Sequence, residues 1–193
     1  MAFLAPPPTA AWRRQGSRSG FEVAYFTLVD DGLAVEGVAS AIEGGQTWAI
    51  DYKLVLDATW TTRRAGISGR SALGLRTVAL EADGAGHWLV DGEIAPHLDG
   101  CLDVDLEGSA MTNALAVHRA GLPIGGQAVV PAAYVRAPDL AVEPLEQIYI
   151  RVSDTQSHQR YDYSAPALGF GCRLLYDASG LVLDYPGIAT RAG

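Results

Sequence analysis

The chain has 193 residues, of which 49% are hydrophobic, and a formal net charge of −8 at pH 7. This length fits one all-β domain, and the apolar fraction is high enough to exclude a disordered chain. The negative charge argues against binding nucleic acid or an anionic membrane surface, and two cysteines do not make a disulfide framework.

The first 20 residues are expected to form a proline-led arm, followed by a single β domain over residues 21–193. Pro6, Pro7 and Pro8 interrupt the start of the chain, which has neither a basic region nor a long apolar run, so it does not resemble a signal peptide. No window approaches the roughly 20 apolar residues of a membrane span. We therefore expect no transmembrane segment and a cytoplasmic location.

One unit occurs three times along the chain: a half-apolar run, a turn rich in Asp and Gly, and a second half-apolar run. The copies are 25–37, 77–92 and 172–187. Asp and Gly tolerate positive φ and suit tight hairpin turns. The repeat predicts antiparallel β structure from end to end. It excludes folds that alternate strands with helices, which include most nucleotide-binding and hydrolase folds.

Alternation of residues with a period of two predicts the other strands. At the start of the domain, Phe21, Val23 and Tyr25 alternate with Glu22 and Ala24. Further strands are expected in 33–42, 48–60, 73–80, 87–90, 101–106, 132–135, 147–152 and 160–163. So many strands must curl to protect their edges. The predicted fold is mainly β, an antiparallel curved sheet forming an open β-barrel or β-roll with little helix.

The segment 111–120 is ambiguous. Its alanines favour a helix, whereas Leu115, Val117 and Arg119 alternate as in a strand. We predict a strand, because the surrounding sequence is β, and keep a helix as the alternative.

Standard catalytic signatures are missing from the sequence. Residues 16–20 carry arginine where a nucleophile elbow needs serine, and 169–171 lacks the third glycine of a dinucleotide fingerprint. The histidines are scattered, and His97 with Cys101 supplies two ligands where a structural zinc site needs four. We predict no cofactor and no metal.

Two carboxylates, Asp103 and Asp105, share one face of a predicted strand. Such a pair can chelate a divalent metal or divide acid and base roles. The alternative is a solvated face, or a pair neutralised by an arginine such as Arg119 or Arg63.

An aromatic residue and a double arginine follow one predicted strand in the segment 60–64. Trp60 offers a flat apolar face, and Arg63 offers a fork for hydroxyl, carboxylate or phosphate oxygens. The alternative is a core tryptophan followed by an exposed basic turn.

Several stretches in order resemble the putative glycolipid-binding family, formerly a domain of unknown function. They are 60–63, 100–106, 111–119, 147–149, and 180–187 with Arg191. The resemblance runs from about Trp12 to Arg191. It implies an open, curved sheet similar to bacterial lipoprotein carriers and mycobacterial lipid-binding lipoproteins. Where the family tends to have paired arginines, this chain has His118 and Arg119.

The resemblance implies a binding protein for a glycolipid or another amphipathic small molecule, held on the curved sheet. The residues expected to hold the polar head are Arg63, Asp103, Asp105, Asn113 and Arg119. Trp60 and Tyr185 are expected to pack on the head, and Tyr149 and Asp184 complete the candidate site.

Two other functions stay open. An enzyme acting on a lipid or sugar would use Asp103 and Asp105 as acid and base. A structural protein would pair its exposed strand edges with a second copy, so the chain is expected to be a monomer or a homodimer.

Overall fold

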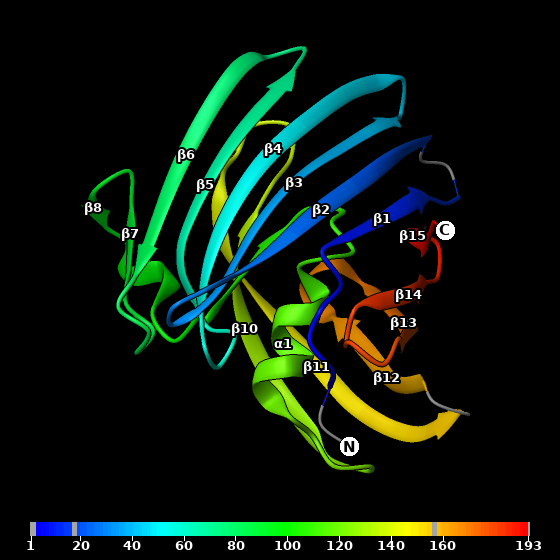
Figure 1. Cartoon of the computed structure of the whole chain (residues 1–193). Helices are drawn as coiled ribbons and strands as arrows, with labels where there is room; N and C mark the ends of the chain where they lie inside the picture. Colours follow the sequence, from blue (N-terminus) through cyan, green and yellow to red (C-terminus); the bar gives the residue numbers. More distant parts are fainter. Residues whose placement is uncertain (1–2, 17–18, 156–157, 193) are drawn as a thin grey trace.

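The computed structural model describes residues 3–16, 19–155 and 158–192, which form one 15-stranded sheet wrapped around a single α-helix (Figure 1). The strands are β1 (Thr9–Arg14), β2 (Ser19–Val29), β3 (Gly32–Glu43), β4 (Gln46–Asp57), β5 (Thr62–Ser71), β6 (Gly74–Ala82), β7 (Trp88–Val90), β8 (Glu93–Ile94), β9 (Asp103–Leu106), β10 (Gln127–Val135), β11 (Val142–Thr155), β12 (His158–Ala165), β13 (Phe170–Tyr176), β14 (Val182–Tyr185) and β15 (Ala189–Arg191). The helices are η1 (Pro96–Leu98), α1 (Asn113–Ala120) and η2 (Pro166–Leu168).

The sheet runs in the order β8-β7-β6-β5-β4-β3-β2-β1-β15-β14-β13-β12-β11-β10-β9. Neighbouring strands are antiparallel, except that β9 pairs with β10 in parallel. Its last strand, β9, curls back toward β5. There the Thr62 N–H donates to the Leu102 carbonyl over 3.0 Å, and the Thr62 hydroxyl oxygen accepts from the Val104 N–H over 3.1 Å. The predicted fold, a curved sheet that stays open, is confirmed.

The three recurring units are hairpins, as predicted: β2–β3, β6–β7 and β13–β14. In two of them an aspartate carboxylate fixes the turn. Asp83 accepts from the backbone N–H groups of Ala85 and His87, and Asp177 accepts from those of Ser179 and Leu181. These two aspartates therefore stabilise their own turns.

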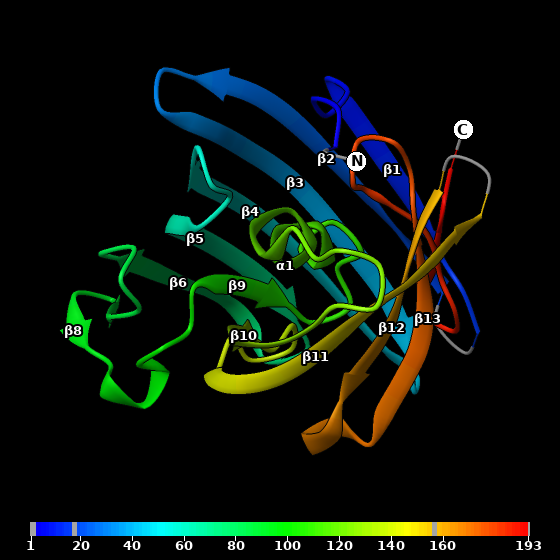
Figure 2. The ribbon, with the colours of Figure 1, turned by 90° about the horizontal axis from the view of Figure 1, so that it is seen from below.

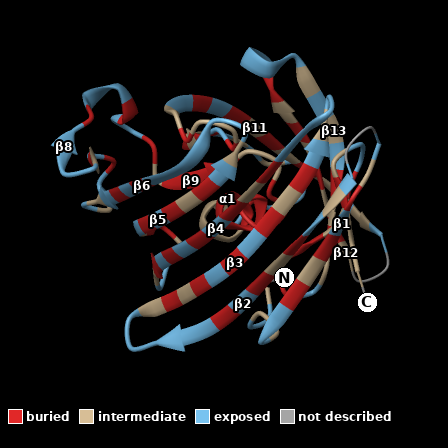
Figure 3. Ribbon diagram, turned by 90° about the horizontal axis from the view of Figure 1, so that it is seen from above, coloured by how far each residue is buried: buried red, intermediate tan, exposed pale blue. Residues whose placement is uncertain are grey.

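Along the long strands, buried residues alternate with exposed or half-buried ones (Figure 3), and the buried residues form the core. The strand predicted over 48–60 corresponds to β4, and its alternation is clear, with Ile50 and Tyr52 both 1% exposed on the inner face. In β2 the period of two is right but the expected facing is reversed: Phe21 and Tyr25 are 41% and 55% exposed, whereas Glu22 is on the buried face. Glu22 is tolerated inside because it accepts a hydrogen bond from the Tyr52 hydroxyl over 2.9 Å. The Tyr52 ring crosses over Gly37 to reach this carboxylate.

The strand predicted for 111–120 is wrong, because residues 113–120 form α1. Three alanines favour the helix, and Gly121 ends it in the left-handed conformation, donating its N–H to the Val117 carbonyl. The helix lies inside the curve of the sheet (Figure 2), with its first five residues buried. Tertiary packing therefore selects helix over the local strand pattern.

The segment predicted as an arm contains β1, which lies between β2 and β15. Trp12 places this strand there, because its side chain is fully buried and donates from Nε1 to the Val182 carbonyl over 2.7 Å. No helix in the described part of the chain is long and apolar enough to cross a membrane.

Candidate functional site

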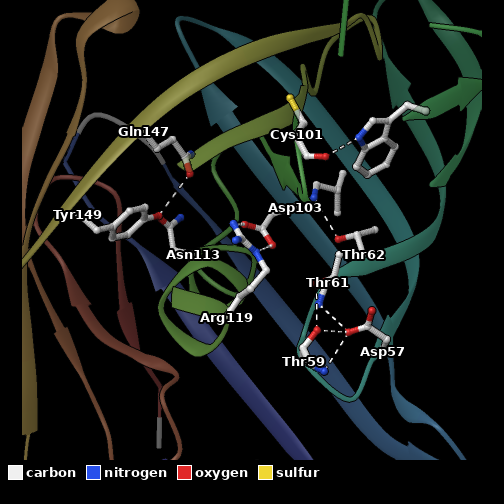
Figure 4. Close-up of polar contacts among 12 residues, drawn as sticks. Asp57, Thr59, Thr61, Thr62, Cys101, Asp103, Asn113, Arg119, Gln147 and Tyr149 are labelled. Carbon is white, nitrogen blue, oxygen red and sulfur yellow. Dashed lines mark hydrogen bonds and ion pairs between the residues drawn. The ribbon is translucent and has the colours of Figure 1, made fainter. Parts of the chain in front are cut away.

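Strand β9 holds helix α1 through its two aspartates. Asp103 accepts two hydrogen bonds from Arg119, at 2.6 Å from Nη2 and 3.1 Å from Nε (Figure 4). Asp105 accepts from the hydroxyl of Thr112, the residue before the helix, over 2.7 Å. The interpretation in which Arg119 neutralises part of this pair is therefore confirmed, and the two carboxylates have different partners.

A buried hydrogen-bond network continues from Asp105 into strands β11 and β12. Gln147 Nε2 donates to Asp105 Oδ2 over 2.7 Å and to the Tyr163 hydroxyl over 3.2 Å. The Tyr149 hydroxyl donates to Asn113 Oδ1 over 3.1 Å and contacts Gln147 Oε1 at 3.4 Å (Figure 4). The network connects the start of α1 to the sheet on the inside of the curve.

Burial raises the pKa of Asp105 to about 7. The hydrogen bonds from Thr112 and Gln147 oppose this rise, whereas the neighbouring carboxylates of Asp103 and Glu22 add to it. Burial also raises the pKa of Asp103, against the opposing effect of Arg119. Asp105 is therefore a carboxyl group that titrates near neutral pH inside the protein.

A third buried carboxylate, Glu22, was not expected from the sequence. It accepts hydrogen bonds from the Ser109 hydroxyl, from the Ala110 N–H over 2.7 Å and from the Tyr52 hydroxyl. Burial raises the pKa of Glu22, with these donors and the charge of Arg14 opposing. Glu22 on β2 thus holds the loop between β9 and α1 from a distant strand of the same sheet.

Beside this network lies a cavity of about 300 Å³, which we name the tyrosine pocket. Its lining residues are Asp105, Leu106, Glu107, Gly108, Ser109, Asn113, Tyr134, Leu145, Tyr163, Leu168, Phe170, Tyr185 and Ile188. Buried polar groups of Asp105 and Asn113 contribute to one part of the lining, and Leu168 is 54% exposed at the rim. The lining therefore combines buried polar groups with aromatic and aliphatic side chains, of which Leu168 reaches solvent.

Aromatic rings form one wall of the tyrosine pocket. Tyr163 and Tyr185 meet edge to face, with ring centroids 6.0 Å apart and planes at 86°. Phe170 lies 6.2 Å from Tyr163 and 5.9 Å from Tyr185. The hydroxyls of Tyr185 and Tyr163 also interact with each other. Packing between the rings fixes the orientation of their faces.

The predicted residue Trp60 lies against α1. Its ring stacks on the imidazole of His118, with centroids 3.5 Å apart and planes 7° from parallel. Phe3 packs against the same imidazole at 4.5 Å. Burial lowers the pKa of His118 to about 4, so the ring is neutral at neutral pH, and its Nε2 lies 2.9 Å from the Ser179 carbonyl oxygen. This stack holds the N-terminal segment and the loop after β4 onto the helix.

The nine predicted site residues thus fall into three groups. Asp105, Asn113 and Tyr185 line the tyrosine pocket, and Tyr149 supports it from behind. Asp103 and Arg119 form the ion pair beside it. The remaining three, Trp60, Arg63 and Asp184, do not line the pocket: Arg63 lies against Gly84 in the β6–β7 turn, and Asp184 is half-buried on β14.

Pocket residues that sequence reasoning missed include Tyr163, Phe170 and Ser109, as well as Gln147 behind the wall. Gln147 and Tyr149 share one face of β11 by alternation, which is a signal that was present in the sequence. The approach of Ser109 to Glu22 depends on contacts between distant segments and has no local signal.

An open curved sheet with an aromatic pocket on its inner side is a β-barrel-like architecture suited to holding a small ligand. The chain belongs to the family described as "Putative glycolipid-binding", whose model matches residues 9–191. No match is found among curated proteins.

Solved structures that resemble the chain include the following two. One is a DUF1089 family protein from Pseudomonas aeruginosa, with 37% sequence identity, a TM-score of 0.75 and coverage of 94% of this chain and 95% of that one. The other is a β-barrel-like protein of DUF1849 from Brucella abortus, with 11% identity, a TM-score of 0.56 and coverage of 98% and 96%. The second likeness concerns the fold alone.

Proposed function

We propose that this protein binds an amphipathic ligand, a glycolipid or a related molecule, with the polar head of the ligand in the tyrosine pocket. The observation that carries the proposal is the pocket itself, which joins buried hydrogen-bonding groups to aromatic faces within one cavity of about 300 Å³. The family to which the chain belongs supports the same class of ligand.

The size and polarity of the pocket suit one head group. A volume of about 300 Å³ is at the lower end for small-ligand sites. Aromatic faces such as those of Phe170 and Tyr185 pack well on the apolar faces of sugar rings. An acyl chain would leave over the rim at Leu168 and Ile188 and gain about 0.8 kcal/mol for each methylene that it buries.

The test compares two phenylalanines that differ in position. Phe170 lies in the pocket wall, whereas Phe21 is 41% exposed and does not line the pocket. Lipids extracted from the purified protein are identified by mass spectrometry, and octyl glucoside is titrated below its micellar concentration by calorimetry. We expect Phe170→Ala to lose the bound lipid and to weaken the titration about tenfold, and Phe21→Ala to keep both. No lipid in the extract together with no heat on titration would contradict the proposal.

A further inference from the structure

The tyrosine pocket has an unequal set of hydrogen-bonding groups, which bears on the kind of head that it accepts. The Tyr163 hydroxyl accepts from Gln147 Nε2 over 3.2 Å and interacts with the Tyr185 hydroxyl, and no further hydrogen-bond partner of these two phenols occurs among the described residues. A phenol has one proton to donate. A hydrogen bond between the two phenols uses only one of their two protons, so a donor is left for a ligand in the pocket that both line.

Asp105 offers the opposite polarity. Each of its carboxylate oxygens accepts one hydrogen bond, from Thr112 on Oδ1 and from Gln147 on Oδ2. An ionised carboxylate has about four acceptor sites, so two are unused. Asp105 and Tyr163 are also close together, because both contact the same nitrogen of Gln147, at 2.7 Å and 3.2 Å.

The charge of the lining is one-sided. Asp105 and Glu107 line the pocket, Glu22 lies behind Ser109, and neither lysine nor arginine is among the described lining residues. Two cations lie outside the lining: Arg14 is behind Gly108 and acts on Glu22, and Arg119 is paired with Asp103. An anionic head would meet like charge in a site where water screens little.

We infer that the pocket selects an uncharged polyol head, such as a neutral hexose, in which one hydroxyl accepts from Tyr163 and a neighbouring hydroxyl donates to Asp105. The inference rests on the proposed function and specifies its ligand class. Neighbouring sugar hydroxyls meet this donor and acceptor together, because each hydroxyl can both donate and accept. At pH 7.5 phosphate, sulfate and carboxylate heads are almost fully ionised, so they have little or no proton to give to Asp105.

Four probes with one tail separate the contributions of head and tail: octyl glucoside, octyl phosphate, octylamine and octanol, each titrated into the wild-type protein by calorimetry at pH 7.5. We expect octyl glucoside to bind at least tenfold more tightly than each of the other three. If none of the four binds, the proposed function itself fails. If octyl phosphate or octylamine equals the glucoside, amphipath binding stands and the inference about the head is overturned.

A pair of tyrosines on β12 tests the donor. Tyr163→Phe removes the hydroxyl that faces the pocket, and Tyr161→Phe removes one that bonds Gln159 outside it. We expect Tyr163→Phe to weaken octyl glucoside about tenfold, as loss of one hydrogen bond predicts, and to leave octanol unchanged. Tyr161→Phe should change neither. Equal affinity of Tyr163→Phe and wild type for the glucoside would overturn the inference. If a variant does not fold, the relative affinities of the four octyl probes for the wild-type protein still test the inference.

Discussion

Gln147 Nε2 lies 2.7 Å from Asp105 Oδ2 and connects the carboxylate to the aromatic wall, because the same nitrogen reaches the Tyr163 hydroxyl at 3.2 Å. The Gln147 amide thus orients both the Asp105 carboxylate and the Tyr163 hydroxyl, which line the same cavity. Both partners are buried, so their geometry is fixed by packing before a ligand arrives. A site preorganised in this way loses little entropy on binding.

The titration of Asp105 gives a prediction for stability. Its pKa is about 7 in the folded protein and ordinarily 3.8. Between these pH values the folded state holds a proton that the unfolded state releases, so the free energy of unfolding falls as pH rises from about 4 to 7. The cost above pH 7 is at most about 4 kcal/mol, at 1.36 kcal/mol for each pKa unit.

Asp105→Asn should flatten this pH dependence, as measured by urea unfolding between pH 4 and pH 8. Glu22 and Asp103 also have raised pKa values, so a smaller dependence of the same sign remains. Asp162→Asn is the control, because Arg173 lowers the pKa of that exposed carboxyl and its small contribution has the opposite sign. An unchanged slope in Asp105→Asn would show that Asp105 does not titrate in this range.

Ligand binding should respond to pH in the other direction. A sugar hydroxyl that donates to Asp105 stabilises the ionised carboxylate and lowers its pKa. The affinity for octyl glucoside is therefore expected to rise between pH 6 and pH 8, while the stability of the free protein falls. Calorimetry in two buffers of different ionisation heat measures the proton released on binding. Affinity that is flat across this range, with no proton release, would exclude a hydrogen bond to ionised Asp105.

The ion pair between Asp103 and Arg119 is expected to matter because it is buried. Removing one partner of a buried pair leaves an uncompensated charge and costs about 3–5 kcal/mol. Arg119→Ala should therefore strongly lower the free energy of unfolding. Arg173 is a matched control, since it makes a similar two-bond contact with Asp162 while 53% exposed. Arg173→Ala should cost about 1 kcal/mol or less. Equal losses in the two variants would refute the role given to burial.

Much of the fold was predictable because it depends on local patterns. Strand alternation and Asp/Gly turns are written in neighbouring residues, and β4 with its inward Ile50 and Tyr52 follows directly from them. The facing of β2 and the state of 113–120 were not predictable in this way. Each depends on a distant partner: Tyr52 and Ser109 for Glu22, and the interior of the curved sheet for the helix.

The candidate site was predictable to a smaller extent. Family resemblance pointed to Asp105, Asn113 and Tyr185, which meet in one pocket. Trp60 and Arg63 follow one another closely in sequence, yet Trp60 stacks on His118 and Arg63 lies in the β6–β7 turn. The sequence pattern showed where the strand ends and the loop begins. It did not show which distant segment each loop side chain would contact.

The contact between Tyr52 and Gly37 gives the last prediction. A Cβ at Gly37 would come within 2.3 Å of the Tyr52 ring, which crosses this glycine to reach Glu22. Gly37→Ala should displace the ring and remove a donor from a buried carboxylate, at a cost of about 1–3 kcal/mol. Gly66→Ala in β5 is the control, because a Cβ there meets nothing within 4 Å. Thermal unfolding of both variants measures the difference.

The same pair of variants also bears on binding. Since Glu22 holds Ser109 in the pocket lining, Gly37→Ala should weaken octyl glucoside binding as well, whereas Gly66→Ala should leave it unchanged. Equal melting temperatures in the two variants would mean that Tyr52 does not depend on the space above Gly37.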